Sequence, residues 1–155
     1  MPAKAAAKKT PRARTRRREP SPLAPAVRRY ITQAHVCRVA TASADGEPHV
    51  IPVCPVYDGH RTLYIDIGPD YRTAHHLAEN PRAVVLIDDY FDDWSKLRRA
   101  ILRCHVREAR GAERDTAWRR IRRKFPQYRG VEWKPRLTLA LEIDAVRHEG
   151  IVREA

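Results

Sequence analysis

Three prolines stand close together in an apolar, β-prone stretch, residues 44–59, that is bracketed by two Asp-Gly pairs. Proline has no N–H to contribute to a β-ladder, so it belongs at an edge, a strand start or a bulge. Pro48, Pro52 and Pro55 therefore predict a strand over 48–57 that is paired on one side only along part of its length. Its unpaired backbone groups could bind the rim of a flat heteroaromatic ring. The prolines could equally protect an ordinary edge strand from aggregation.

Other combinations of reactive side chains are weak or missing in the sequence. There is no Ser/His/Asp set, no paired-carboxylate motif and no nucleotide-binding glycine-rich loop, so we assign no catalytic residue. Cys37, Cys54 and Cys104 are odd in number and lack CxxC spacing, which favours reduced thiols and a cytoplasmic protein. Only His75 and His76 are adjacent, and neighbours on a helix point to different sides, so no metal site is predicted.

Residues 1–22 differ in composition from the rest of the chain. They hold eight Lys/Arg against one acid, with four prolines and one large apolar residue, and they supply +7 of the formal net charge of +12. Such a segment cannot bury enough apolar surface to offset the entropy lost on ordering, so a disordered basic tail is predicted. It is expected to be a solvated extension or to make weak, nonspecific contacts with nucleic acid. Residues 23–155 are expected to form one domain, and no apolar run approaches the ~20 residues of a membrane span.

Side-chain periodicity and turn signals divide this domain into three helices and six strands. The expected helices are 23–34, 70–80 and 111–128, and the expected strands are 35–43, 48–57, 62–67, 82–89, 97–110 and 135–151. The strand at 82–89 is almost continuously apolar, which predicts burial on both faces. The first three strands are joined by tight turns and must be antiparallel. The pattern favours a mainly β fold that closes into a small antiparallel barrel.

The succession of these motifs resembles the pyridoxamine 5′-phosphate oxidase-like flavoprotein superfamily. The segments that carry the likeness are RVATASADGEPHVIPVCPVYDG, LYIDI and YRTAHHLAENPRAVVLID. Two later segments, DDYFDDWSKL and KFPQY, are similar to a bacterial subgroup of coenzyme F-420-dependent enzymes. The likeness covers about residues 27–151. It implies a six-stranded split β-barrel of the FMN-binding type, assembled as a homodimer.

The resemblance also implies that a flavin-type cofactor, coenzyme F-420 or FMN, binds at each subunit interface along the proline-rich strand. A phosphate clamp is expected where the third strand passes into the next helix. Arg72 and Thr73 stand there, although the basic residue usual in the family falls at Thr73. The guanidinium fork and the helix N-terminus both suit a phosphate. The residues assigned to the cofactor are Val50, Ile51, Pro52, Val53, Tyr64, Ile65, Asp66, Arg72 and Thr73.

The function implied by the resemblance is that of an oxidoreductase, a flavoprotein that transfers a hydride or electrons from its cofactor to a small organic substrate. A non-catalytic flavin- or haem-binding protein of the same fold is one alternative, with His49 or His75 as an iron ligand. A nucleic-acid-associated module acting through residues 1–22 is another. Trp94 is expected at the dimer interface, and Trp133 either at the partner's cofactor or on the core.

Overall fold

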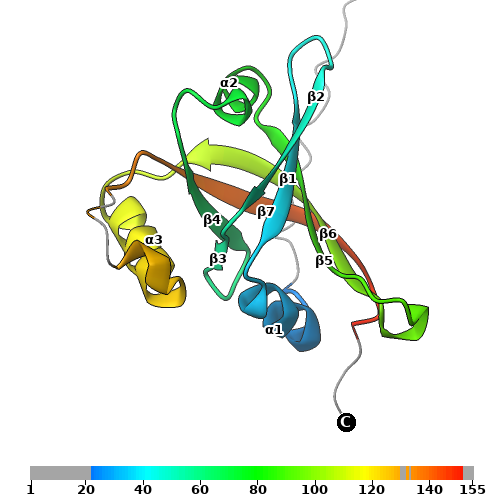
Figure 1. Cartoon of the computed structure of the whole chain (residues 1–155). Helices are drawn as coiled ribbons and strands as arrows, with labels where there is room; N and C mark the ends of the chain where they lie inside the picture. Colours follow the sequence, from blue (N-terminus) through cyan, green and yellow to red (C-terminus); the bar gives the residue numbers. More distant parts are fainter. Residues whose placement is uncertain (1–21, 130–131, 133, 152–155) are drawn as a thin grey trace, which may run out of the picture.

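Seven antiparallel strands form one sheet in the computed structural model, which describes residues 22–129, 132 and 134–151. In pairing order the strands are β2 (Pro48–Val53), β1 (Cys37–Ala42), β5 (Arg82–Asp89), β6 (Arg98–Glu108), β7 (Leu137–Glu149), β4 (Thr62–Ile67) and β3 (Val56–Tyr57). The helices are α1 (Pro25–Gln33), α2 (Arg72–Glu79) and α3 (Gly111–Lys124), with 3-10 turns η1 (Trp94–Lys96) and η2 (Pro126–Tyr128). Figure 1 shows α1 and α3 at the same end of the sheet, on either side of β3, and α2 at the opposite end beside β2.

The strand expected over 48–57 changes its partner partway along, and this corrects the expected number of strands from six to seven. Its first part, β2, pairs with β1 along its whole length. After Cys54 and Pro55 the chain continues as β3, which pairs instead with β4. Because β2 and β3 are the two ends of the pairing order, these two residues join the ends of the sheet. The sheet therefore curls into a split barrel.

The prediction that the proline-rich strand is paired on one side only is confirmed. Among the described residues, β1 is the only strand that pairs with β2, and β3 reaches only Leu63 and Tyr64 of β4. Residues 65–67 of β4 consequently pair with β7 alone. The barrel thus has two backbone edges without a ladder partner, one on β2 and one on the second half of β4.

Two hairpins turn the chain on either side of this strand. The turns contain Gly46 and Gly59, with φ of 93° and 86°, a region of backbone conformation that favours glycine. Asp58 supports the second turn, because its carboxylate accepts the backbone N–H groups of His60 and Thr62 at 2.7 and 3.0 Å. The two Asp-Gly pairs seen in the sequence are therefore hairpin turns.

Side chains that alternate along the strands fill the barrel. Those with no exposed surface include Val39, Leu63, Ile65, Val85, Leu102 and Leu141. β5 does not show the predicted burial on both faces, since buried and more exposed residues alternate along it and Val84 is 40% exposed. Val84 lies on the outer face of the sheet, where the described chain leaves it uncovered.

A second, smaller core attaches α3 to the barrel. Trp118, Ile121 and Phe125 are buried there against Val56, as the apolar stripe of this segment predicts. The helix is shorter than expected, since it ends at Lys124 and Pro126 begins η2. Proline has no N–H to continue the helical hydrogen bonding, which accounts for the early end.

Polar contacts fix both ends of α3. At its C-terminal end the Lys124 ammonium donates to the carbonyl of Ala34 at 2.5 Å and to that of Pro55 at 3.0 Å. Lys124 therefore links α1 and α3 to the residues where β2 passes into β3. Partial burial lowers the pKa of this amine below its ordinary value.

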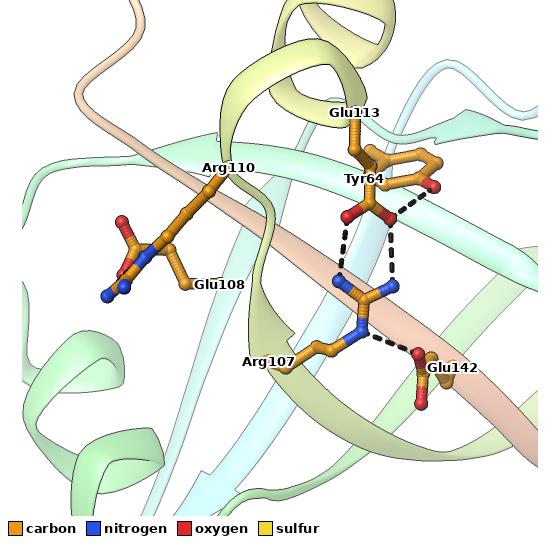
Figure 2. A network of polar contacts seen from close by, with 6 residues as sticks. All are labelled: Tyr64, Arg107, Glu108, Arg110, Glu113 and Glu142. Atoms are coloured by element: carbon orange, nitrogen blue, oxygen red, sulfur yellow. Dashed lines mark hydrogen bonds and ion pairs between the residues drawn. The ribbon is translucent and has the colours of Figure 1, made fainter.

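The N-terminal end of α3 is held by a network centred on Glu113 (Figure 2). Arg107 of β6 donates two hydrogen bonds of 2.8 Å to this carboxylate and one of 2.6 Å to Glu142 of β7. The Tyr64 hydroxyl on β4 donates to the same carboxylate at 2.9 Å. Burial, reinforced by this contact, raises the pKa of Tyr64 to about 12, while the Arg107 guanidinium holds the pKa of Glu113 below its usual range.

Glu113→Gln is expected to lower the free energy of unfolding by about 1 kcal/mol at neutral pH, because it removes the charged acceptor of this network. The folded-state pKa of Glu113 is depressed, so its stabilisation is complete above the unfolded-state pKa and is lost as pH falls through the folded-state pKa. The difference between the two proteins should therefore be present at pH 7 and shrink towards about pH 3.

Urea unfolding at the two pH values measures this difference. Glu108→Gln is the matched control, because Glu108 pairs with exposed Arg110 beside the network without joining it. Equal unfolding free energies for Glu113→Gln and the parent at neutral pH would contradict the assignment.

Candidate functional site

The unpaired edge of β2 runs beside the opening of the barrel. Alternate residues of this strand face opposite sides, and Val50 on the outward side is 58% exposed. Ile51 and Val53, on the other side, pack against the barrel core. All four residues assigned from the sequence, Val50 to Val53, thus lie on an edge strand whose second row of backbone groups has no strand partner among the described residues.

The start of α2 lies next to the start of β2. Arg72 is the first residue of the helix, and its exposed guanidinium pairs at 3.0 Å with Glu47, which immediately precedes β2. Farther along α2, the ring of buried His76 contacts the ring of His49 on β2, with 5.8 Å between centroids. A 3.3 Å contact joins Nδ1 of His76 to the hydroxyl of Thr41 on β1. These contacts bring the predicted phosphate clamp to one end of the predicted ring-binding strand.

Thr73, in the first turn of α2, has a buried hydroxyl group that lacks a hydrogen-bond partner among the described residues. Its side chain is fully buried, and its Oγ1 is the only buried side-chain nitrogen or oxygen in the described residues without a hydrogen-bond partner. Buried hydroxyl groups are nearly always hydrogen-bonded, since leaving one unpaired is costly. The first N–H groups of a helix also lack intrahelical acceptors, and Tyr71 at the N-cap supplies no side-chain acceptor. Arg72, Thr73 and these N–H groups together fit an anionic oxygen.

The side chains of three other residues assigned to the cofactor make contacts within the fold instead. The Tyr64 hydroxyl is held by Glu113 on α3, and the Ile65 side chain is fully buried in the barrel. The Asp66 carboxylate accepts the hydroxyl of Thr138 at 2.8 Å and the backbone N–H of Arg136 at 3.2 Å. Burial raises the pKa of Asp66 despite these contacts. Their side chains support β4, β7 and α3, while the backbone of Ile65 and Asp66 lies on the open edge of β4.

The outer face of the sheet beside β2 is apolar and hollowed. Ala40 of β1 stands between Val50 of β2 and Val84 of β5 in the strand register. A pocket of about 360 Å³ covers Ala40 and Val84 but does not reach Val50, and its lining also includes Asn80, Arg82 and Arg103. The sequence marked the strand at 82–89 as apolar and as a support for a dimer, but the expected burial of both its faces is wrong within one chain, because only one face lies against the barrel core.

The remaining candidates do not join this site. Trp94 is 75% exposed in the loop between β5 and β6, together with Tyr90 and Phe91. All three cysteines are free thiols. Trp133 and nearly all of the basic tail, residues 1–21, lie outside the described residues.

Neither a metal site nor a membrane span is found in the part of the chain that the structure describes. Its His, Cys, Asp and Glu residues form no group of three or more that could hold a metal ion. None of its helices has the length and apolar composition needed to span a bilayer.

Comparison with solved structures identifies the same fold in proteins of low sequence identity. The haem storage protein HutZ from Vibrio cholerae superposes with a TM-score of 0.63 at 14% identity, covering 79% of this chain and 92% of that one. A haem-binding protein from Mycobacterium smegmatis gives a TM-score of 0.68 at 18% identity, covering 81% of this chain and 53% of that one. A candidate pyridoxamine 5′-phosphate oxidase from Listeria innocua gives 0.63 at 17% identity, covering 80% and 95%.

Comparison of sequences identifies the family. No curated protein is similar enough in sequence to match this chain. The family model described as pyridoxamine 5′-phosphate oxidase matches residues 23–149, which includes every helix and strand described above. The chain therefore belongs to the pyridoxamine 5′-phosphate oxidase family.

Proposed function

We propose that this chain is a homodimeric oxidoreductase that binds coenzyme F-420 or FMN along β2 and serves a small organic substrate. One observation carries the proposal: the break at Cys54 and Pro55 leaves the backbone edges of β2 and β4 open beside the start of α2. Such edges can hydrogen-bond to the rim of a planar ring, and the first turn of α2 can bind an anionic group. When bound, the cofactor supplies hydride or electron transfer.

The phosphate end of the cofactor is assigned to Arg72 and Thr73. Arg72 now pairs with exposed Glu47, an ion pair that contributes little at the surface and is easily exchanged for phosphate oxygens. The unpaired hydroxyl of Thr73 would gain the acceptor that it lacks. The fit of these residues to a phosphate supports binding of FMN or the deazaflavin, which share this group.

The ring end is assigned to the backbone of Val50, Ile51, Pro52 and Val53, with Ile65 and Asp66 of β4 across the opening. Tyr64 acts indirectly in this proposal, since its hydroxyl anchors α3 through Glu113. The residues of this chain would hold the cofactor, orient its ring and exclude water. No proton donor is assigned among them.

The homodimer is supported by the uncovered outer face of the sheet. Val50 and Val84 expose apolar side chains on either side of Ala40, next to the edge that is assigned to the ring. A second copy seated over this face would bury both valines and close the ring site from outside. Covering such an apolar surface is the usual role of a subunit interface.

Haem binding is the second candidate function. Two proteins of similar fold are described as haem storage or haem-binding proteins. In this chain His49 lies on the ring-binding strand itself, and His75 is exposed on α2. Imidazole nitrogens are common iron ligands in haem proteins.

The three cofactors are separated by one experiment on the purified chain. FMN, coenzyme F-420 and haemin are titrated under identical conditions, and binding is followed by flavin or deazaflavin fluorescence and by the Soret absorbance. Saturable binding of FMN or the deazaflavin is expected. A Soret shift with a His49→Ala-sensitive affinity, in the absence of flavin binding, would replace the first function with the second.

Arg72→Ala is expected to weaken cofactor affinity by roughly 10- to 100-fold, because it removes a charge-assisted contact to phosphate. Thermal stability should change little, since the side chain is exposed. Arg110→Ala is the control, because Arg110 is likewise exposed and paired with a surface carboxylate, Glu108. Equal cofactor titration curves for Arg72→Ala and the parent would remove Arg72 from the site.

Thr73→Val should separate stability from binding. Replacing the unpaired buried hydroxyl by a methyl group of similar shape is expected to raise the free energy of unfolding without cofactor by about 1 kcal/mol. The same change should weaken cofactor affinity, because the hydroxyl that would bind phosphate is gone. Urea unfolding and cofactor titration measure the two effects. A loss of stability with unchanged affinity would show that the hydroxyl serves the fold alone.

A further inference from the structure

A second pocket lies at the other end of the proline-rich strand, beyond the crossover. It has a volume of about 440 Å³, is open to solvent, and is bordered by α1 and the residues that follow it, by β3, and by the last two turns of α3. Figure 1 shows α1 and α3 on either side of β3 at this end of the barrel. The lining residues are Thr32, Gln33, His35, Val56, Tyr57, Arg120, Arg123 and Lys124.

The wall that α3 provides is strongly positive. Arg120, Arg123 and Lys124 all line the pocket, whereas no aspartate or glutamate does. Within the described part of the chain none of these three cations forms an ion pair, in contrast to Arg107 and Arg114, which both do. This pocket therefore holds positive charge that no side chain of the described residues neutralises.

Asp58 directly follows Tyr57, one of the residues that line this pocket. Its carboxylate already accepts the backbone N–H groups of His60 and Thr62 in the hairpin turn. Asp58 also lies outside the lining of the pocket. Asp58 is therefore committed to the hairpin turn and is not a counter-ion of the three cations in the described structure.

Two of the cations are held in place by neutral acceptors. Arg120 donates to the carbonyl of Tyr57 at 3.2 Å, and Lys124 donates to the carbonyls of Ala34 and Pro55. An ammonium group has three N–H donors, so Lys124 retains one for a ligand. Its partial burial makes the missing counter-ion more costly than it would be on an open surface. Arg123 makes no side-chain hydrogen bond to any described residue, and its fork is available to two oxygens at once.

We propose that this pocket binds a small organic anion, whose carboxylate or phosphate oxygens pair with Arg123 and Lys124. Its apolar part lies over β3 and the aliphatic stems of the arginines. The volume falls in the ordinary range for small-molecule sites. The site is separate from the clamp at Arg72, which lies at the opposite end of β2, about 20 Å of extended chain away.

The experiment uses the full chain at low ionic strength and three matched probes: phenyl phosphate, benzoate and the neutral benzyl alcohol. Calorimetric titration is expected to show saturable binding of the two anions and none of the alcohol. Arg123→Gln should raise the dissociation constant of the anions by about fivefold or more, because it removes a charged bidentate donor. Benzoate and phenyl phosphate as separate arms show whether the site prefers a carboxylate or a phosphate.

One variant serves as the matched control. Arg119→Gln lies on the same helix and alters an exposed guanidinium that donates to Thr116 and does not line the pocket. It should leave the dissociation constants within about twofold of the parent, since this charge does not face the pocket. Absence of saturable anion binding, or an equal loss in Arg119→Gln and Arg123→Gln, would overturn the proposal.

Anion binding in this pocket does not require the proposed cofactor. Arg123→Gln is expected to leave the titration with FMN or coenzyme F-420 unchanged. If the protein binds the anions but none of the cofactors, the proposed function is wrong and the anion site is supported. If it binds a cofactor but none of the anions, the anion site is wrong and the proposed function is supported.

Discussion

The barrel depends on one short interruption, at Cys54 and Pro55, where a single stretch of chain leaves one end of the sheet and joins the other. Proline has no N–H with which to extend the ladder of either strand. The chain therefore connects the two ends of the sheet, but the sheet itself stays incompletely closed. The edge of β2 and the second half of the edge of β4 have no ladder partner. The Lys124 ammonium donates to the Pro55 carbonyl and so ties the C-terminal end of α3 to this interruption.

Local sequence signals accounted for most of the fold. Asp-Gly pairs mark both hairpin turns, alternation marks the strands, and the spacing of Trp118, Ile121 and Phe125 identifies the buried face of α3. Each of these features depends on neighbours in the sequence, which is why it could be read without a structure. The errors have local causes as well. The apolar run of β5 led to the expectation that both faces of this strand are buried, but only one face lies against the barrel core. Composition alone does not say what covers the other face of the strand.

The candidate site was less predictable, because its residues are positioned by partners far away in the chain. Asp66 was assigned to a cofactor, yet its carboxylate binds Arg136 and Thr138 at the start of β7. Tyr64 has a similar long-range partner in Glu113. By contrast, Arg72 pairs with Glu47 beside β2, and the buried hydroxyl of Thr73 has no partner among the described residues. Their assignment to a phosphate stays a prediction. No local pattern signals the cationic pocket, since its walls come from three separate elements.

The position of β7 has a consequence for the order in which the barrel assembles. β7 is the last strand in the sequence, yet it lies between β6 and β4, with Thr62 opposite Glu142. During synthesis β6 and the β3–β4 hairpin must therefore wait, each with one open flank, until β7 has left the ribosome. Pairings this distant in sequence make closure a late and slow event. The nascent chain is consequently most exposed to misassociation just before β7 is complete.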